Sequence, residues 1–121
     1  MQSSLSTLDL DETYKIAWMV VSEKAYESLG ATPEDLEGFV DYPRFIDGIQ
    51  VGLLFRKVSR NAIKVSLRSN GAVNVNPVAR KFGGGGHNQA SGALVTGSME
   101  RVKKDVIEGV REAVEISGIL K

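Results

Sequence analysis

The chain has 121 residues and a mass of 13.1 kDa, enough for one domain to bury a core without disulfides or a structural metal. It contains no cysteine, so disulfides, cysteine nucleophiles and structural zinc fingers are excluded, and a cytoplasmic location is the expectation. Fifteen lysines and arginines balance fifteen aspartates and glutamates, so an anion site has to be local rather than a property of the whole surface.

The first twelve residues are polar and rich in serine, with leucines at positions 5, 8 and 10. This composition is typical of a linker or a loose helical lead-in. We therefore predict that residues 1–12 lead in from a missing upstream domain and that residues 13–121 form the domain itself. No apolar run approaches the roughly 20 residues that span a bilayer, and the start lacks a signal-peptide pattern, so no membrane association is expected.

The next segment predicts a buried strand followed by helices. Residues 14–21 are apolar on both alternating faces, which is typical of a strand that is covered on both sides. Capping residues, a proline and acidic first-turn residues then predict two short helices, one over residues 23–29 and one that begins at residues 32–35. Helices are accordingly expected on both faces of the sheet.

A β-hairpin is predicted between residues 49 and 68. The first strand covers residues 49–56 and the polar turn covers residues 57–61. In the second strand, three apolar residues alternate with polar ones: Ile63, Val65 and Leu67 with Lys64, Ser66 and Arg68. The period of two puts Arg68 on the face opposite the apolar residues, at the strand end that leads toward a glycine run. Such an arginine either meets a ligand or is simply solvated.

Four consecutive glycines, Gly83 to Gly86, precede His87, which is the only histidine. Glycine weakens helices and strands, so a core alone gives no reason for this run, whereas bare backbone lets amide groups converge on an anion. We expect a phosphate cradle in which the amides of residues 84–86 point at oxygens while Arg68 and His87 donate further hydrogen bonds. The alternatives are a flexible linker and a histidine that only caps or fills the loop.

The flanks of the glycine run predict helical turns. Asn76 as N-cap and Pro77 at the first helical position predict a short helix over residues 77–82. Residues 87–92 can form a second helical turn whose free N–H groups would face the loop. The run is neither a P-loop, because His87 stands where that motif needs lysine, nor a dinucleotide-binding fingerprint, because it follows a helix rather than a strand.

The last segment predicts a strand over residues 93–96 and a long amphipathic helix. Gly97 and Ser98 are expected to cap this helix and Gly118 to end it. Its apolar residues recur at steps of three and four, at positions 99, 102, 106, 110, 113 and 114, which is typical of a face packed on a core. The fold class predicted for the chain is α/β, a mixed β-sheet with an antiparallel hairpin, flanked by helices on both faces.

The run GGGGHNQASG, residues 83–92, resembles the GGGH-x-x-A-(A/S)-G signature of the domain that accompanies the catalytic Asp-His-His domain in the DHH phosphoesterases. The resemblance is to the nanoRNase and pAp-phosphatase type, and it extends to SLRSN (66–70), NVN (74–76) and DLEGFVDYPR (35–44). It implies a C-terminal substrate-binding domain that is inactive alone, in a phosphodiesterase or phosphatase acting on short oligoribonucleotides, pAp or cyclic or linear dinucleotides. The expected partners are that ligand and an N-terminal DHH catalytic domain, and the resemblance allows a homodimer.

The resemblance also implies a division of labour. Manganese is expected in the missing catalytic domain and no cofactor in this chain, where one histidine cannot build a two-metal site, so no catalytic residue is assigned. The substrate-binding residues would be Arg68, Ser69, Asn74, Asn76, Gly84, Gly85, Gly86 and His87. Many relatives have aspartate where this chain has Asn74, which leaves a charged role there open.

The alternative is a nucleic-acid-binding accessory module like the related C-terminal domain of alanyl-tRNA synthetases. Such a module should show a stripe of lysines and arginines. The basic residues near the glycine run are only Arg68, Arg80 and Lys81, which favours a small ligand.

Overall fold

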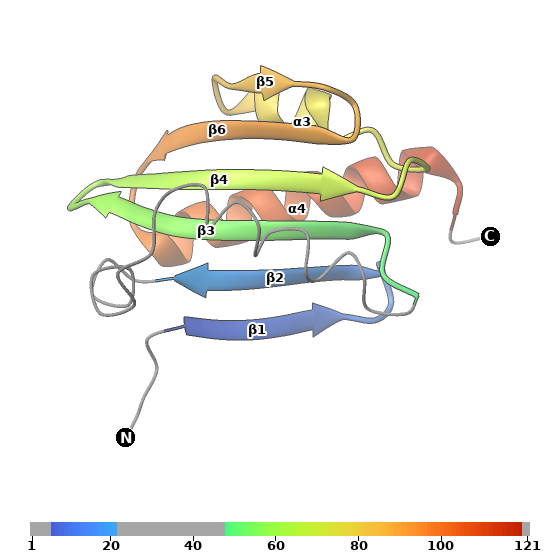
Figure 1. The fold of residues 1–121 in the computed structure, drawn as a ribbon, viewed down its shortest axis with the longest axis horizontal. Helices are drawn as coiled ribbons and strands as arrows, with labels where there is room; N and C mark the ends of the chain where they lie inside the picture. Colours follow the sequence, from blue (N-terminus) through green and yellow to red (C-terminus); the bar gives the residue numbers. More distant parts are fainter. Residues whose placement is uncertain (1–5, 22–47, 120–121) are drawn as a thin grey trace.

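The computed structural model describes residues 6–21 and 48–119. These residues form a six-stranded sheet with the strand order β1-β2-β3-β4-β6-β5 (Figure 1). The strands are β1 (Ser6–Asp11), β2 (Ile16–Val21), β3 (Val51–Ser59), β4 (Ala62–Ser69), β5 (Gly85–Gly86) and β6 (Ala90–Thr96). Neighbouring strands are antiparallel except β2 and β3, which are parallel. The predicted α/β class and the mixed sheet with its antiparallel hairpin are confirmed.

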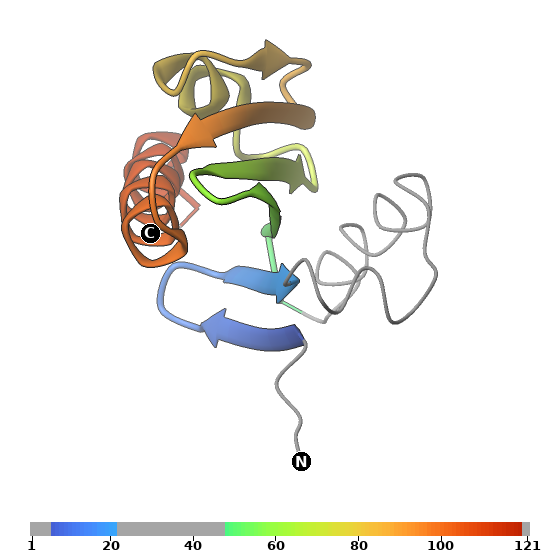
Figure 2. The same cartoon turned by 90° about the vertical axis from the view of Figure 1, so that its left-hand side faces the viewer.

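Two helices are described, α3 (Asn76–Lys81) and α4 (Met99–Ser117), and both lie on the same face of the sheet (Figure 2). The helices predicted at residues 23–29 and from residue 32, and the motif at residues 35–44, fall outside the described residues. Ala17 and Leu54 point to the face opposite α4 and are also buried, as expected for strands that are apolar on both sides. Neither helix of the described part is long and apolar enough to cross a bilayer.

Helix α4 forms one wall of the core. Ser98 caps it by accepting a hydrogen bond from the Arg101 amide at 3.3 Å, and Gly118 ends it in the left-handed conformation with φ of 80°, so both predicted ends are confirmed. The buried residues of α4 are Val102, Val106, Ile107, Val110 and Val114. They pack on residues from β2, β3 and β4 that share one face of the sheet, including Ile16, Phe55 and Leu67.

Strand β1 corrects the expectation that the chain is a loose lead-in up to residue 12. Ser6–Asp11 pairs along its whole length with β2, and Asp11 fixes it to α4. The Asp11 carboxylate accepts hydrogen bonds from Arg111 Nε at 2.9 Å and from the Tyr14 amide at 3.1 Å, and it lies 2.8 Å from Arg111 Nη2. That these residues continue from an upstream domain remains a prediction.

The hairpin of β3 and β4 is longer than predicted. A bulge between Lys57 and Ser59 lets β3 continue to Ser59, so the turn shrinks to Arg60 and Asn61. At its other end, β4 reaches Ser69 and brings Arg68 to the end of the sheet where the chain turns toward α3. This end of the sheet holds most of the predicted binding residues.

Candidate functional site

The candidate site lies where the end of β4, the connection from β4 to α3 and the turn between β5 and β6 meet (Figure 1). Arg68 is the register partner of Ala90 at the start of β6. The turn is tied to its neighbours by backbone hydrogen bonds, from the Ser69 amide to the Gln89 carbonyl and from the Val75 amide to the Asn88 carbonyl, both 2.9 Å long. These bonds hold the turn that carries His87 beside Arg68.

The structure gives the glycine run a packing reason, which the sequence analysis did not. A Cβ on Gly84 would lie 2.0 Å from the Gly92 carbonyl oxygen, and one on Gly86 would lie 2.6 Å from the Ala90 carbonyl oxygen. Both contacts are far closer than any side chain can approach. Gly83 serves differently, because its φ of 88° ends α3 in the left-handed region. Three of the four glycines are thus required by backbone geometry.

The predicted cradle of converging amides is wrong at two of its three residues. The Gly84 amide donates to the Ala79 carbonyl at 2.9 Å, and the Gly86 amide donates to Asn76 Oδ1 at 3.1 Å. Gly85 is the strand partner of Gly92. The run therefore builds a short strand at the sheet edge, and the amides of Gly84 and Gly86 are already bonded within the domain.

Asn76 ties α3 to this strand. It was predicted as the helix N-cap, but the N-cap is Val75, with no capping side-chain bond. Asn76 instead lies in the first turn and uses Oδ1 for Gly86, while its own amide donates to Asn74 Oδ1 at 3.1 Å. Asn74 thus holds Asn76, and Asn76 holds the loop at Gly86. That either asparagine contacts a ligand remains a prediction.

Replacing Asn76 by alanine is expected to loosen the loop without unfolding the domain. The Gly86 amide loses its acceptor, so its hydrogen exchange should accelerate about fivefold or more, corresponding to a bond worth about 1 kcal/mol. Exchange measured by NMR is the readout, with Asn76→Asp, which keeps the oxygen, as the matched control. An unchanged Gly86 exchange rate in Asn76→Ala would show that the bond does not hold the loop.

The predicted helical turn at residues 87–92 is wrong, because β6 begins at Ala90 and residues 87–89 form the turn of a tight hairpin with β5. The His87 amide donates to the Ala90 carbonyl at 2.8 Å, and the His87 carbonyl accepts from Ser91 Oγ at 2.5 Å. The backbone of His87 is thereby fixed while its side chain is exposed. Residues 87–89 therefore do not themselves present a helix N-terminus to the glycine run.

Arg68 and Ser69 are adjacent but point to opposite faces of β4. Ser69 is buried on the side of the core and accepts a hydrogen bond from the Gly71 amide at 3.1 Å, so its hydroxyl shapes the turn. Arg68 is partly buried on the other face and donates from Nη1 to the Leu67 carbonyl at 3.0 Å and the Ser91 carbonyl at 3.5 Å. The structure brings Arg68 and the His87 turn together but leaves Ser69 out of this group.

The charge of residues 48–99, which supply the candidate site, is one-sided. Residues 48–99 contain no aspartate or glutamate, although the whole chain has fifteen. The same stretch contains seven basic residues, Arg56, Lys57, Arg60, Lys64, Arg68, Arg80 and Lys81. In the described ranges no three histidines, aspartates or glutamates lie close enough to hold a metal ion. Residues 48–99 therefore carry a net positive charge.

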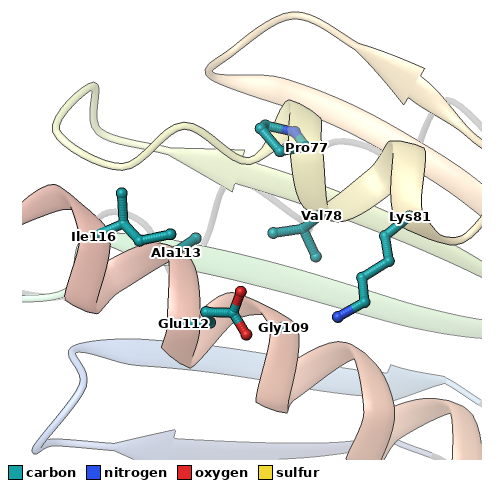
Figure 3. A pocket seen from close by; sticks show the side chains of 7 residues that line it. All are labelled: Pro77, Val78, Lys81, Gly109, Glu112, Ala113 and Ile116. Atoms are coloured by element: carbon teal, nitrogen blue, oxygen red, sulfur yellow. The ribbon is translucent and has the colours of Figure 1, made fainter.

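A shallow groove between α3 and α4 is a different feature (Figure 3). Its walls are mostly apolar, with Lys81 and Glu112 at the rim, and the full lining is Pro77, Val78, Lys81, Gly109, Glu112, Ala113 and Ile116. None of the predicted binding residues lines it. The groove is a seam between two packed helices.

The DHHA1 domain family model matches residues 13–115. The chain belongs to the DHHA1 domain family. This DHHA1 domain is 37% identical over 103 residues to the bifunctional oligoribonuclease and PAP phosphatase NrnA of Thermus thermophilus, covering 84% of this chain and 31% of that protein. The corresponding NrnA of Mycoplasma genitalium is 32% identical over 107 residues, covering 84% of this chain and 30% of that protein. The chain thus spans about a third of the length of these relatives.

Two solved structures resemble the DHHA1 domain. An exopolyphosphatase-related protein from Bacteroides fragilis matches with a TM-score of 0.83 and 27% identity, over 93% of this chain and 33% of that one. The C-Ala domain of Aquifex aeolicus alanyl-tRNA synthetase matches with a TM-score of 0.60 and 16% identity, over 82% of this chain and 89% of that one. The second likeness shows the fold alone. The DHH-associated assignment of the nanoRNase type is confirmed, and the chain is a DHH-family accessory domain.

Proposed function

We propose that this DHHA1 domain holds the phosphorylated end of a short oligoribonucleotide, of pAp or of a dinucleotide for a DHH catalytic domain. On its own it does not hydrolyse the ligand. The relatives named as oligoribonucleases and PAP phosphatases support the substrate class, and their greater length leaves room for the catalytic domain. Manganese chemistry would belong to that other domain.

The observation that carries the proposal is the meeting of Arg68 with the His87 turn in a stretch free of carboxylates. A guanidinium forms charge-assisted hydrogen bonds to phosphate, roughly twice as strong as neutral ones. An imidazole on the adjacent fixed turn supplies a second donor from a side chain that is exposed. Asn74, Asn76 and the glycine strand would then hold this turn in place rather than donate the main ligand bonds.

The test compares diadenylate with and without a 5′-phosphate, titrated by calorimetry against the 121-residue chain. We expect the 5′-phosphate to improve affinity about tenfold or more, the value of one charge-assisted contact. Equal affinities would contradict phosphate recognition. An unfractionated tRNA that competes at equal concentration would favour the accessory-module alternative instead.

A further inference from the structure

Lys64 is a basic residue that the sequence analysis gave no role. It lies on β4 four residues before Arg68, so both side chains leave the strand on the same face. Its register partner on β6 is Leu94, but its ammonium leans diagonally, so that a Cβ on Gly92 would lie 3.7 Å from Lys64 Nζ. In the described part of the chain no hydrogen bond or ion pair engages Lys64.

Arg68 leans toward the same stretch of β6 from the other direction. Its Nη1 lies 3.5 Å from the Ser91 carbonyl oxygen, next to the glycine over which Lys64 lies. Gly92 has no side chain, and Ala90, the partner of Arg68, carries only a methyl group on this face. Two cationic groups thus lie over the same stretch of β6, where Ala90 and Gly92 leave the backbone nearly bare.

We propose that Lys64 binds a second phosphate, the internal phosphodiester that follows the terminal phosphate held at Arg68. This inference rests on the proposed function and specifies its ligand as a strand with at least two phosphates in succession. An ammonium on a flexible stem suits an internal phosphodiester because it needs no fixed bidentate geometry, whereas the planar guanidinium suits the terminal group. Lys64 therefore distinguishes an oligonucleotide from a mononucleotide.

The experiment titrates the chain and its Lys64→Gln variant with 5′-AMP and with pApA, followed by NMR chemical shifts. We expect Lys64→Gln to weaken pApA binding about five- to tenfold and to reduce the salt dependence of its affinity by about one phosphate contact. Binding of 5′-AMP should change less than about twofold, since its one phosphate stays at Arg68. The matched control is Lys104→Gln, which removes the same charge from an exposed position on α4, on the other face of the sheet.

Three results would overturn the inference. Equal losses for 5′-AMP and pApA in Lys64→Gln would place Lys64 at the first phosphate. Equal losses of pApA affinity in Lys64→Gln and Lys104→Gln would show that the effect comes from overall charge and not from a contact at Lys64. If the unmodified chain binds neither nucleotide, the proposed function itself fails. This outcome differs from a failure of the Lys64 inference because it appears before any substitution is made.

Discussion

Gly84→Ala is expected to lower the free energy of unfolding by about 3 kcal/mol, at the upper end of the cost of overpacking. The added methyl group would meet the Gly92 carbonyl oxygen at 2.0 Å and both Cα and Cβ of Ala93 at 2.7 Å. The clash can be relieved only if Gly85–Gly86 moves away from β6, because the atoms that the methyl group meets belong mainly to the backbone. Urea unfolding followed by fluorescence of Trp18, the single tryptophan, measures the change.

Gly83→Ala is the matched control. Among the described residues, a Cβ on Gly83 would meet nothing within 4 Å, so the strain comes from its φ of 88°. The left-handed conformation costs a side chain roughly 1–2 kcal/mol, so Gly83→Ala should be clearly milder. If Gly84→Ala is no less stable than Gly83→Ala, the close approach of β5 to β6 is not what requires glycine. The result would then favour the flexible-linker interpretation of the glycine run.

Arg68→Ala is expected to weaken binding of a 5′-phosphorylated dinucleotide about ten- to a hundredfold. A charge-assisted bond to phosphate has a net value of roughly 1.5–3 kcal/mol, and each tenfold change in affinity corresponds to about 1.4 kcal/mol. If His87 binds the same phosphate, His87→Ala and Arg68→Ala should give non-additive losses in the double variant, as residues of one network do. Calorimetric titration of the two single variants and the double variant measures all three losses.

Two controls accompany this prediction. Arg101→Ala removes an arginine whose side chain is 81% exposed on α4, and it should leave dinucleotide affinity unchanged. Melting curves show whether losing the bonds from Arg68 to the Leu67 and Ser91 carbonyls alters the fold. If the loss is the same for a dinucleotide that lacks the 5′-phosphate, Arg68 does not recognise a terminal phosphate.

The parts of the fold that the sequence predicted are those set by local periodicity. Alternation with a period of two predicted β3 and β4 to within a few residues, and the valine stripe with Ser98 and Gly118 predicted α4 and both its ends. These signals are read within one element and need no knowledge of its partner. The same alternation put Arg68 on the face opposite the core, where the structure has it.

The parts that the sequence did not predict depend on contacts between distant segments. Position 84 must be glycine because the Gly92 carbonyl oxygen lies against it. Asn76 does not cap α3 because its Oδ1 accepts a hydrogen bond from the Gly86 amide, ten residues away. Neither relation is visible in one short window. Strand β1 did carry a local signal, since Leu8 and Leu10 alternate with Asp9 and Asp11, but the serine-rich surroundings favoured a linker. The role proposed for Lys64 depends on its position over Gly92 of the neighbouring strand, which no short window of the sequence shows.

The two-residue strand β5 has a consequence for how the molecule behaves at high concentration. It closes one edge of the sheet, and an edge that exposes a long row of unpaired N–H and C=O groups is a template for strands of other molecules. Gly85–Gly86 offers only two residues of such a row, and one of its amides is occupied by Asn76. An incoming chain therefore finds too little backbone to add to the sheet here. At β5, this edge of the sheet is in this way protected from aggregation by the shortness of the strand.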